Sequence, residues 1–579
     1  MFREKPQGGG VDVAAHPEPL FGPERGRHEI IQPGSRETRN LIETVIMSEY
    51  VNNDVDVVVV GTGAGGMSTA ISAAGHGLSV CLLEKSGTWG GSTARSGGGV
   101  WIPGNDILRA EAPADHLEDA RRYLHAIVGE DASPERIDAY IDRGPEALRF
   151  LSDRSELDLH WVPGYSDYLP EQPGGQASGR SVEPRPFDLR RLGEDAATLT
   201  PFYAKTPANV VVLQEDYRWL STGLRTWRGP WHMLRVATRT AVARARGQRL
   251  VGLGNALAGS LMLGVRRAGV PVMLDTAVVE LTTEGNRVTG VVTADGTQIT
   301  ARRGVVLACG GFDHNEEMRR QYQREPASAA LSLGATGNTG DGILAAQRLG
   351  AGTALMDDAW WAPSIPLPSQ PWFALAERSL PRSLMVNDRG QRFMNESLPY
   401  VEATHAMFGG VRGAGDGPAE NLPAWLLFDQ QYRNRYIFAG LQPGQRIPKK
   451  WTEAGVVVKA DTIEELAELT KLPVDALKAT IERFNGFARS GTDEDFGRGN
   501  SAYDRYYGDP TNKPNPNLGE IKNGPFYAAK MVPGDLGTKG GIVTDIHGRA
   551  LREDGSVIEG LYASGNVSGP VMGHTYPGP

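Results

Sequence analysis

The sequence has few cysteines and no long apolar run. Cys81 and Cys309 are the only cysteines, and each lies in an apolar, β-like stretch, so neither a disulfide framework nor a cysteine-based metal site is expected. The first ten residues, MFREKPQGGG, lack an apolar signal core. No stretch of about 18 uninterrupted apolar residues occurs. We therefore expect a cytoplasmic protein with no bound metal and no integral membrane segment.

A basic block is also missing. Lys and Arg total 60 against 69 Asp and Glu, for a formal net charge of -9 and a pI near 5.8. Because no cluster of Lys and Arg could follow a phosphate backbone, nucleic acid is not an expected partner. A chain of 579 residues is too long for one ordinary core, so two domains are expected.

Composition divides the chain into four segments. Residues 1–46 mix Pro, Gly and charge without periodicity, which predicts a disordered extension and favours Met47 as the natural start. From Val55, apolar strands alternate with amphipathic helices, so residues 47–356 are predicted to begin a Rossmann-like α/β domain. Residues 357–533, rich in Trp, Pro and Tyr, are expected to form an inserted α+β catalytic domain, and residues 534–579 to return to the first domain.

A glycine pattern follows the first strong strand. The stretch VVVVGTGAGG places Gly61, Gly63 and Gly66 between a strand and a helix. Gly61 permits the tight turn, Gly63 lets a pyrophosphate approach the backbone, and Gly66 lets helix and strand pack closely. Glu84 closes the next strand, where an acidic residue binds ribose hydroxyls. The spacing predicts a dinucleotide site.

A second glycine-rich stretch, GGSTARSGGGV, follows this acidic residue. Its small side chains let backbone amides approach a large flat ligand. With this stretch the chain resembles the FAD-dependent flavoproteins of the fumarate reductase and succinate dehydrogenase superfamily, which implies FAD as the cofactor. The motif and the resemblance together assign further FAD contacts to Lys85, Gly91, Ser92, Thr93, Ser96, Gly98, Gly310, Gly311, Gly565 and Asn566.

The region after residue 356 favours an apolar substrate. Its stretch DDAWWAPSIPLPSQPWFALAE is rich in Trp, Phe and Pro, and no cationic clamp for a dicarboxylate is recognisable, which argues against a fumarate reductase. The stretches MDDAWWAP, RFMNESLPYVEATH, DLGTKGGIVTD and GHTYPGP resemble the 3-ketosteroid Δ1-dehydrogenases. This resemblance implies FAD-dependent removal of a hydride from C1 and a proton from C2 of a 3-ketosteroid, in steroid degradation.

The same resemblance gives roles to three tyrosines. Tyr400 in NESLPY corresponds to the base, Tyr168 in SDYLPE to the tyrosine that hydrogen-bonds the base, and Tyr576 in GHTYPGP to the donor to the C3 oxygen. Tyr165 remains a rival for Tyr168, because only local spacing separates them. His574 is expected to orient the turn before Tyr576.

Several alternatives stay open. The family pattern continues past Pro579 with a glycine that supplies a second donor to the C3 oxygen, so the return segment is interpreted as truncated: either the sequence is an incomplete record of an active enzyme, or the protein is a noncatalytic flavoprotein remnant. A 3-ketosteroid Δ4-(5α)-dehydrogenase is the second enzymatic alternative. The electron acceptor is expected to be a quinone or an artificial dye. The charges of DEDFGRG, residues 493–499, are expected to form a solvated loop or hinge.

Overall fold

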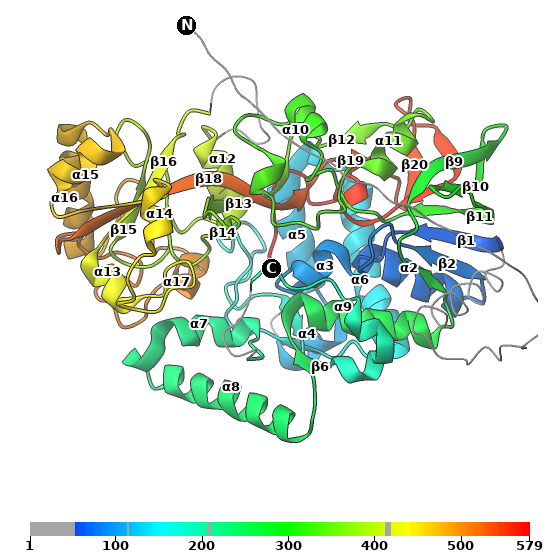
Figure 1. The fold of residues 1–579 in the computed structure, drawn as a ribbon, viewed down its shortest axis with the longest axis horizontal. Helices are drawn as coiled ribbons and strands as arrows, with labels where there is room; N and C mark the ends of the chain where they lie inside the picture. Colours follow the sequence, from blue (N-terminus) through cyan, green and yellow to red (C-terminus); the bar gives the residue numbers. More distant parts are fainter. Residues whose placement is uncertain (1–52, 113–114, 205–209, 411–418) are drawn as a thin grey trace, which may run out of the picture. The chain divides into compact units, whose positions relative to one another are not determined.

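The computed structural model describes residues 53–579, except 113–114, 205–209 and 411–418. The expected extension at 1–46 and the start at Met47 lie outside the described residues. Two sheets contain most of the strands, one of eight and one of six (Figure 1). The fold class is therefore the expected one, a Rossmann-like α/β unit combined with a second α+β unit.

Parallel strands form the centre of the eight-stranded sheet. In spatial order they are β8 (Val272–Met273), β2 (Val80–Leu83), β1 (Asp54–Val60), β11 (Gln298–Leu307) and β21 (Val557–Ala563). Antiparallel pairing adds β9 (Val278–Glu284), β10 (Arg287–Thr293) and β20 (Arg549–Leu551). The carboxyl ends of β1, β2 and β11 meet at one edge of the sheet, where ligands bind in folds of this class.

Strand β1 is buried on both faces. Val57 and Val59 pack in a core with helix α2 (Ala64–Gly75), whereas Val58 and Val60 pack in the core on the opposite face. A nearly continuous run of β-branched residues is typical of such a central parallel strand. The expected strand, turn, helix and strand between Val55 and Leu83 is thus confirmed.

The other elements of this part of the chain are mostly helical. The helices are α3 (Gly91–Arg95), α4 (Asp106–Glu111), α5 (Leu117–Val128), α6 (Pro134–Arg154), α7 (Gln214–Thr222), α8 (Arg228–Ala245), α9 (Leu253–Arg267), α10 (Glu316–Tyr322) and α11 (Asp341–Gln347). The short strands are β3 (Val100–Trp101), β4 (Leu159–Trp161), β5 (Ser181–Pro184), β6 (Phe187–Asp188), β7 (Leu250–Val251), β12 (Thr353–Ala354) and β19 (Gly541–Ile542). In Figure 1, α7 and α8 form a helical hairpin at the bottom of the view.

The second sheet is antiparallel and packs on two different cores. Its strands are β14 (Trp372–Phe373), β13 (Ala359–Ile365), β18 (Phe526–Thr538), β16 (Ala424–Asp429) and β15 (Ser383–Val386), with β17 (Val457–Ala460) paired to β18. One face packs on α15 (Ile463–Thr470) and α16 (Val474–Ser490). The other face packs on a core rich in tyrosine. The remaining helices are α12 (Tyr400–Met407), α13 (Gln430–Arg435), α14 (Lys449–Glu453) and α17 (Ala502–Tyr507).

Strand β18 passes the expected end of the insert. It pairs with β13, β16 and β17 and ends at Thr538, so the expected division between residues 533 and 534 falls inside one strand. In Figure 1 this strand, in orange, runs from the sheet at the left toward the middle of the view. Strand β18 therefore continues across the expected boundary, and the domain limits remain a prediction.

The expectation of a solvated loop at residues 493–499 is wrong for two of its charges. Asp493 is 3% exposed and Arg498 is 0% exposed. Arg498 Nη1 lies 3.0 Å from Glu396 Oε2, and Arg392 bridges Glu396 and Asp493 at 2.8 and 2.9 Å. A local run of charges indicates a surface, but here the partners come from a distant part of the chain. The network supports the loop that leads to Tyr400.

Replacing Arg498 by methionine is expected to lower the free energy of unfolding by about 3–5 kcal/mol, because Glu396 then loses a buried partner. Urea unfolding measures the change. The control Arg483→Met removes a guanidinium that is 59% exposed in its pair with Asp495, so it should cost less than about 1 kcal/mol. Equal losses in the two variants would contradict the buried network.

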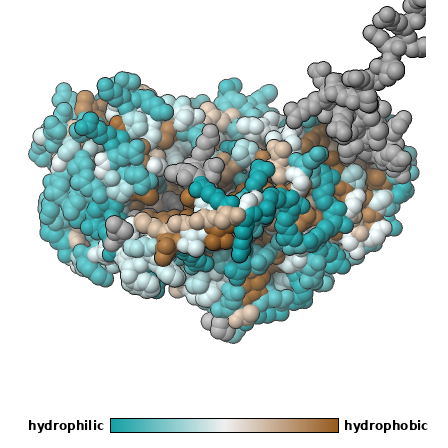
Figure 2. Space-filling view, turned by 60° about the horizontal axis from the view of Figure 1, so that its bottom comes forward, coloured by the Kyte–Doolittle hydropathy of each residue, from teal (hydrophilic) through white to brown (hydrophobic). Residues whose placement is uncertain are grey.

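The face shown in Figure 2 is mostly hydrophilic, with hydrophobic residues in separate patches. Trp227 and Trp231, at the start of α8, are 76% and 57% exposed. Within the described ranges, no helix has both the length and the apolar character needed to cross a membrane.

Candidate active site

The glycine turn after β1 has the predicted geometry. Gly61 has φ +107, and a Cβ there would lie 2.4 Å from the carbonyl oxygen of Ala308, the residue directly after β11. A Cβ on Gly66 would lie 1.8 Å from the carbonyl oxygen of Gly61. Helix α2 therefore starts in close contact with the strand, with Gly63 as its N-cap. Backbone N–H groups at such a helix start bind phosphate.

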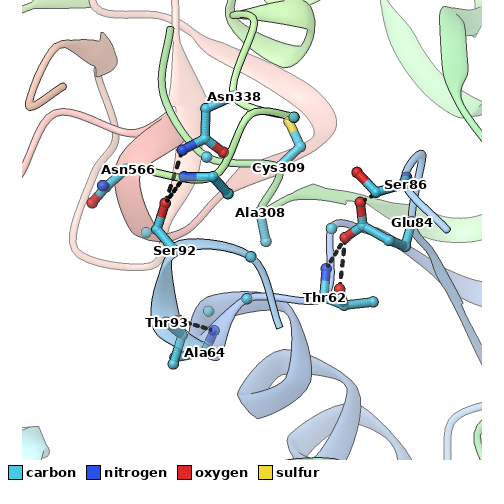
Figure 3. Close-up of a pocket in the computed structure, with 18 of the residues that line it drawn as sticks. Thr62, Ala64, Glu84, Ser86, Ser92, Thr93, Ala308, Cys309, Asn338 and Asn566 are labelled. Carbon is cyan, nitrogen blue, oxygen red and sulfur yellow. Dashed lines mark hydrogen bonds between the residues drawn. The ribbon is translucent and has the colours of Figure 1, made fainter. Parts of the chain in front are cut away.

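Glu84 lies beside this turn (Figure 3). Its Oε2 accepts hydrogen bonds from Thr62 N at 3.1 Å and Thr62 Oγ1 at 2.6 Å, and its Oε1 accepts one from Ser86 N at 3.0 Å. These bonds fix the orientation of the carboxylate. The neighbouring Lys85 instead donates to Thr339 and pairs with Asp341.

The second glycine-rich stretch is tied to the first and to a third loop. Thr93 Oγ1 accepts a hydrogen bond from Ala64 N at 2.9 Å, at the start of α2. Ser92 Oγ accepts from Ala335 N at 3.0 Å and Asn338 Nδ2 at 2.9 Å. Figure 3 shows these side chains around one opening.

A cavity of about 610 Å³ lies between these loops. Most of the residues proposed as cofactor contacts line it: Gly61, Gly63, Glu84, Lys85, Gly91, Ser92, Thr93, Ser96, Gly310, Gly565 and Asn566. Gly66, Gly98 and Gly311 are not among the lining residues. Gly66 acts in helix packing, as expected, and Gly98 and Gly311 lie tightly against Leu253 and Thr538.

Sequence reasoning missed a third glycine-rich loop. Thr336, Gly337 and Asn338 line the cavity, as does Thr62 in the first turn. The stretch GATGNTGDG, residues 334–342, has the small-residue composition that identified the second stretch, and it could have been found by the same signal.

The three tyrosines assigned from the motifs are brought together. Tyr168 OH donates a hydrogen bond to Tyr400 OH at 3.1 Å. The ring centres of Tyr168, Tyr400 and Tyr576 lie 5.2 to 5.7 Å apart, in edge-to-face arrangements. These residues come from three distant parts of the chain, so only the tertiary fold creates the cluster.

Tyr165, the rival for Tyr168, has a different partner. Its hydroxyl lies 2.6 Å from Tyr507 OH, and its ring stacks on Tyr506 with centres 4.5 Å apart. Of the two candidates, it is Tyr168 whose hydroxyl donates to Tyr400. This geometry favours Tyr168 as the partner of the proposed base.

The phenols lie in a dry environment. Burial raises the pKa of Tyr400 well above its ordinary value, and the neighbouring phenols add to this effect, whereas the hydrogen bond from Tyr168 lowers the pKa. Burial also raises the pKa of Tyr576, and its interaction with Tyr400 lowers it. The hydrogen bond from Tyr168 to the Tyr400 oxygen therefore partly offsets the free-energy cost of charging the buried Tyr400 phenol.

Tyr576 joins the tyrosine cluster to the cavity. It lines the cavity together with Trp360, and the two ring centres lie 4.7 Å apart. Trp360 Nε1 donates to Asn566 Oδ1 at 3.2 Å. A ligand in the cavity would thus lie beside the cluster.

Contacts with the first part of the chain place the turn that carries Tyr576. Pro577 O accepts hydrogen bonds from Tyr168 N at 3.0 Å and Tyr123 OH at 2.8 Å. His574 N donates to Asp131 Oδ2 at 3.0 Å, and its ring lies against the same carboxylate. These contacts are those of a residue that orients the turn.

The site is that of a flavoprotein. Residues 56–579 match the family described as FAD binding domain, and the chain belongs to this family. The residues present fit the cofactor: glycine-rich turns line the cavity, the start of α2 offers N–H groups that can bind phosphate, and the Glu84 carboxylate is held in place by hydrogen bonds.

Comparison with similar proteins identifies a more specific family within the FAD-binding one. A 3-oxosteroid 1-dehydrogenase of Mycolicibacterium smegmatis is 62% identical over 541 residues, which cover 92% of this chain and 95% of the relative. At this level of identity the chain belongs to the 3-oxosteroid 1-dehydrogenase family.

Solved structures are also similar. The 3-ketosteroid Δ1-dehydrogenase of Sterolibacterium denitrificans, in complex with 1,4-androstadiene-3,17-dione, is 38% identical, with a TM-score of 0.84 over 91% of this chain and 96% of that one. The 3-ketosteroid Δ4-(5α)-dehydrogenase of Rhodococcus jostii RHA1 is 24% identical, with a TM-score of 0.61 over 91% of this chain and 94% of that one. The second similarity shows a shared fold alone.

Proposed function

We propose that the protein is an FAD-dependent 3-ketosteroid 1-dehydrogenase, which introduces a C1–C2 double bond in steroid degradation. The observation that carries the proposal is the hydrogen-bonded pair of Tyr168 and Tyr400 beside Tyr576, at the wall of a cavity suited to FAD. The identity with 3-oxosteroid 1-dehydrogenases supports it.

The chemistry needs a polarised ketone. A proton next to a carbonyl is removed only if the charge that develops on the carbonyl oxygen is stabilised. In our proposal Tyr576 donates a hydrogen bond to the C3 oxygen of the steroid. Because this phenol is partly buried and packs against the apolar core, its bond acts in a medium less polar than bulk water, where such a contact is stronger.

Tyr400 then takes the proton from C2. Tyr168 donates to the oxygen of Tyr400, so the charged form of Tyr400 is stabilised and its lone pair is oriented. Bound FAD would supply the hydride acceptor for the hydrogen at C1.

Apolar side chains exclude water from this cluster. The ring of Phe373 lies edge-on to Tyr400 with centres 5.1 Å apart, and Leu367, Met394 and Leu536 belong to or pack against the same core. Such surroundings suit the rings of a steroid better than a charged substrate. They also strengthen the hydrogen bonds between the phenols.

Glu84 is proposed to bind the ribose hydroxyls of FAD. Glu84→Leu should weaken FAD binding about 10- to 100-fold, because a hydrogen bond to a charged group contributes about 1.5–3 kcal/mol. Fluorescence titration of the apoprotein with FAD measures the dissociation constant. Glu84→Gln keeps a neutral acceptor and should give an intermediate value. An unchanged affinity in Glu84→Leu would contradict the assignment.

We further propose a quinone or an artificial dye as the electron acceptor, and a cytoplasmic location. The proposed division is into a first part of the FAD-binding domain at 47–356, an inserted catalytic domain and a return segment. Limited proteolysis with mass spectrometry would test these domain limits.

Product analysis tests the function. Purified protein should show flavin absorbance and reduce a dye with 4-androstene-3,17-dione, giving the product with a new C1–C2 double bond. A C4–C5 double bond formed from a saturated ring A would instead identify a Δ4-(5α)-dehydrogenase. Flavin-free protein with no turnover would support a noncatalytic flavoprotein remnant.

A further inference from the structure

A fully buried ion pair lies behind the turn that carries Tyr576. Lys539 Nζ is 3.0 Å from Asp358 Oδ2, and both side chains are 0% exposed. Asp358 Oδ1 also accepts hydrogen bonds from His405 Nε2 at 2.9 Å and from Trp361 Nε1. Although burial opposes it, Lys539 and His405 hold the pKa of Asp358 well below its ordinary value.

Lys539 makes two contacts that lead toward the active site. Its ammonium donates a hydrogen bond to the backbone carbonyl of Thr575 at 3.0 Å, directly before Tyr576. It also lies 4.9 Å from the ring centre of Trp360, whose ring is tilted against that of Tyr576 and lines the cavity. One cation therefore contacts both the backbone and the aromatic neighbour of the proposed C3-oxygen donor.

Thr575 has a second anchor on the side of the base. Its Oγ1 donates to Glu402 Oε1 at 2.8 Å, and Glu402 lies in the first turn of α12, whose first residue is Tyr400. The peptide before Tyr576 is thus held from one side by Lys539 and from the other by the helix that begins at the base. The position of this peptide therefore affects the distance between Tyr576 and Tyr400.

Stability alone does not require the pair. Removing two charges from water costs free energy that their attraction often does not recover, and apolar replacements of buried ion pairs are often neutral. Lys539 has no contact with bulk water, so the donor to the Thr575 carbonyl is the specific feature that an apolar side chain would lack.

We propose that Lys539 is a positioning residue for steroid desaturation. It holds the Thr575 carbonyl and Trp360, and so keeps the ring of Tyr576 at its distance from the ring of Tyr400. The proposal rests on the proposed function. Asp358 keeps the ammonium charged in a buried place, and His405 and Trp361 keep Asp358 in position.

The test removes both charges of the ion pair, so that neither partner is left buried and unpaired. In Lys539→Met/Asp358→Asn the amide oxygen can still accept from His405 and Trp361, and methionine fills the space of the lysine stem. Melting temperature and flavin content should match the wild type. The kcat should fall about 10- to 100-fold, the loss typical of removed support for a functional group, with KM changed less than threefold.

Rescue separates a positional role from a structural one. Lys539→Gln/Asp358→Asn restores a neutral donor and should recover part of kcat relative to the methionine variant. The control Arg266→Met/Asp195→Asn removes a surface pair whose side chains are 36% and 26% exposed and should leave kcat unchanged. A methionine variant with wild-type kcat, or equal losses in the methionine and glutamine variants, would overturn the proposal.

Crystal structures keep the test independent of turnover. In the wild type the ring centres of Tyr400 and Tyr576 are 5.7 Å apart, and the proposal expects this separation to change in the methionine variant and to return in the glutamine variant. An unchanged separation in the methionine variant would overturn it. Wild-type protein that binds flavin but does not desaturate steroids would refute the proposed function instead.

Discussion

Tyr400→Phe is expected to lower kcat for 3-ketosteroid desaturation by about 10²- to 10⁴-fold, the contribution of a positioned general base. The phenyl ring keeps the edge-to-face contacts of Tyr400 with Phe373 and Tyr576, so folding and FAD binding should be unchanged. Stopped-flow absorbance of the flavin after mixing with 4-androstene-3,17-dione measures the step directly.

The pH profile provides a second criterion for Tyr400. Burial and neighbouring phenols raise its pKa well above the ordinary value, so the base form is scarce at neutral pH and becomes more abundant as pH rises. The kcat of the wild type should therefore increase with pH, whereas the residual rate of Tyr400→Phe should not. The control Tyr527→Phe removes the hydroxyl that donates to Gln430 and should leave kcat unchanged. A loss smaller than about tenfold in Tyr400→Phe would exclude it as the base.

Tyr576→Phe has the second largest expected effect. Loss of one donor to a developing oxyanion costs about 10²- to 10³-fold in kcat. The ring contact with Trp360, 4.7 Å between centres, remains in the variant, so flavin content and steroid affinity should change little. Single-turnover flavin reduction gives the rate, and titration with the steroid product gives the affinity.

The two tyrosine variants should differ in their pH dependence. Tyr576→Phe retains the base and its partner Tyr168, so its reduced kcat should still rise with pH. If the rates of Tyr576→Phe and Tyr400→Phe responded to pH in the same way, the separate roles of donor and base would be wrong.

The Rossmann-like part could be predicted from local patterns. The valines of β1, the glycine turn and Glu84 are close in sequence, and each follows from a local requirement of backbone or packing. Of these residues, Gly61 and Gly66 are now seen in the predicted tight contacts. The catalytic roles of the tyrosines remain predictions, although the structure brings their side chains together.

Features that depend on distant partners were not predictable. Arg498 looks like a surface charge, because nothing near it in the sequence reveals its contact with Glu396, 102 residues away. The contact of Lys539 with Asp358 likewise joins two segments that are far apart in the sequence. In the glycine-rich loop at 334–342, by contrast, the local composition is a usable signal.

Strand β18 limits how the cleft can open. Its ladder continues from Phe526 to Thr538, its residue Leu536 lines the cavity, and Lys539 follows at once. A hinge within β18 would break its hydrogen bonds to β13, β16 and β17, so any bending is expected outside residues 526–538. Because β18 is continuous, a packing defect in the antiparallel sheet is expected to shift Leu536 at the cavity wall.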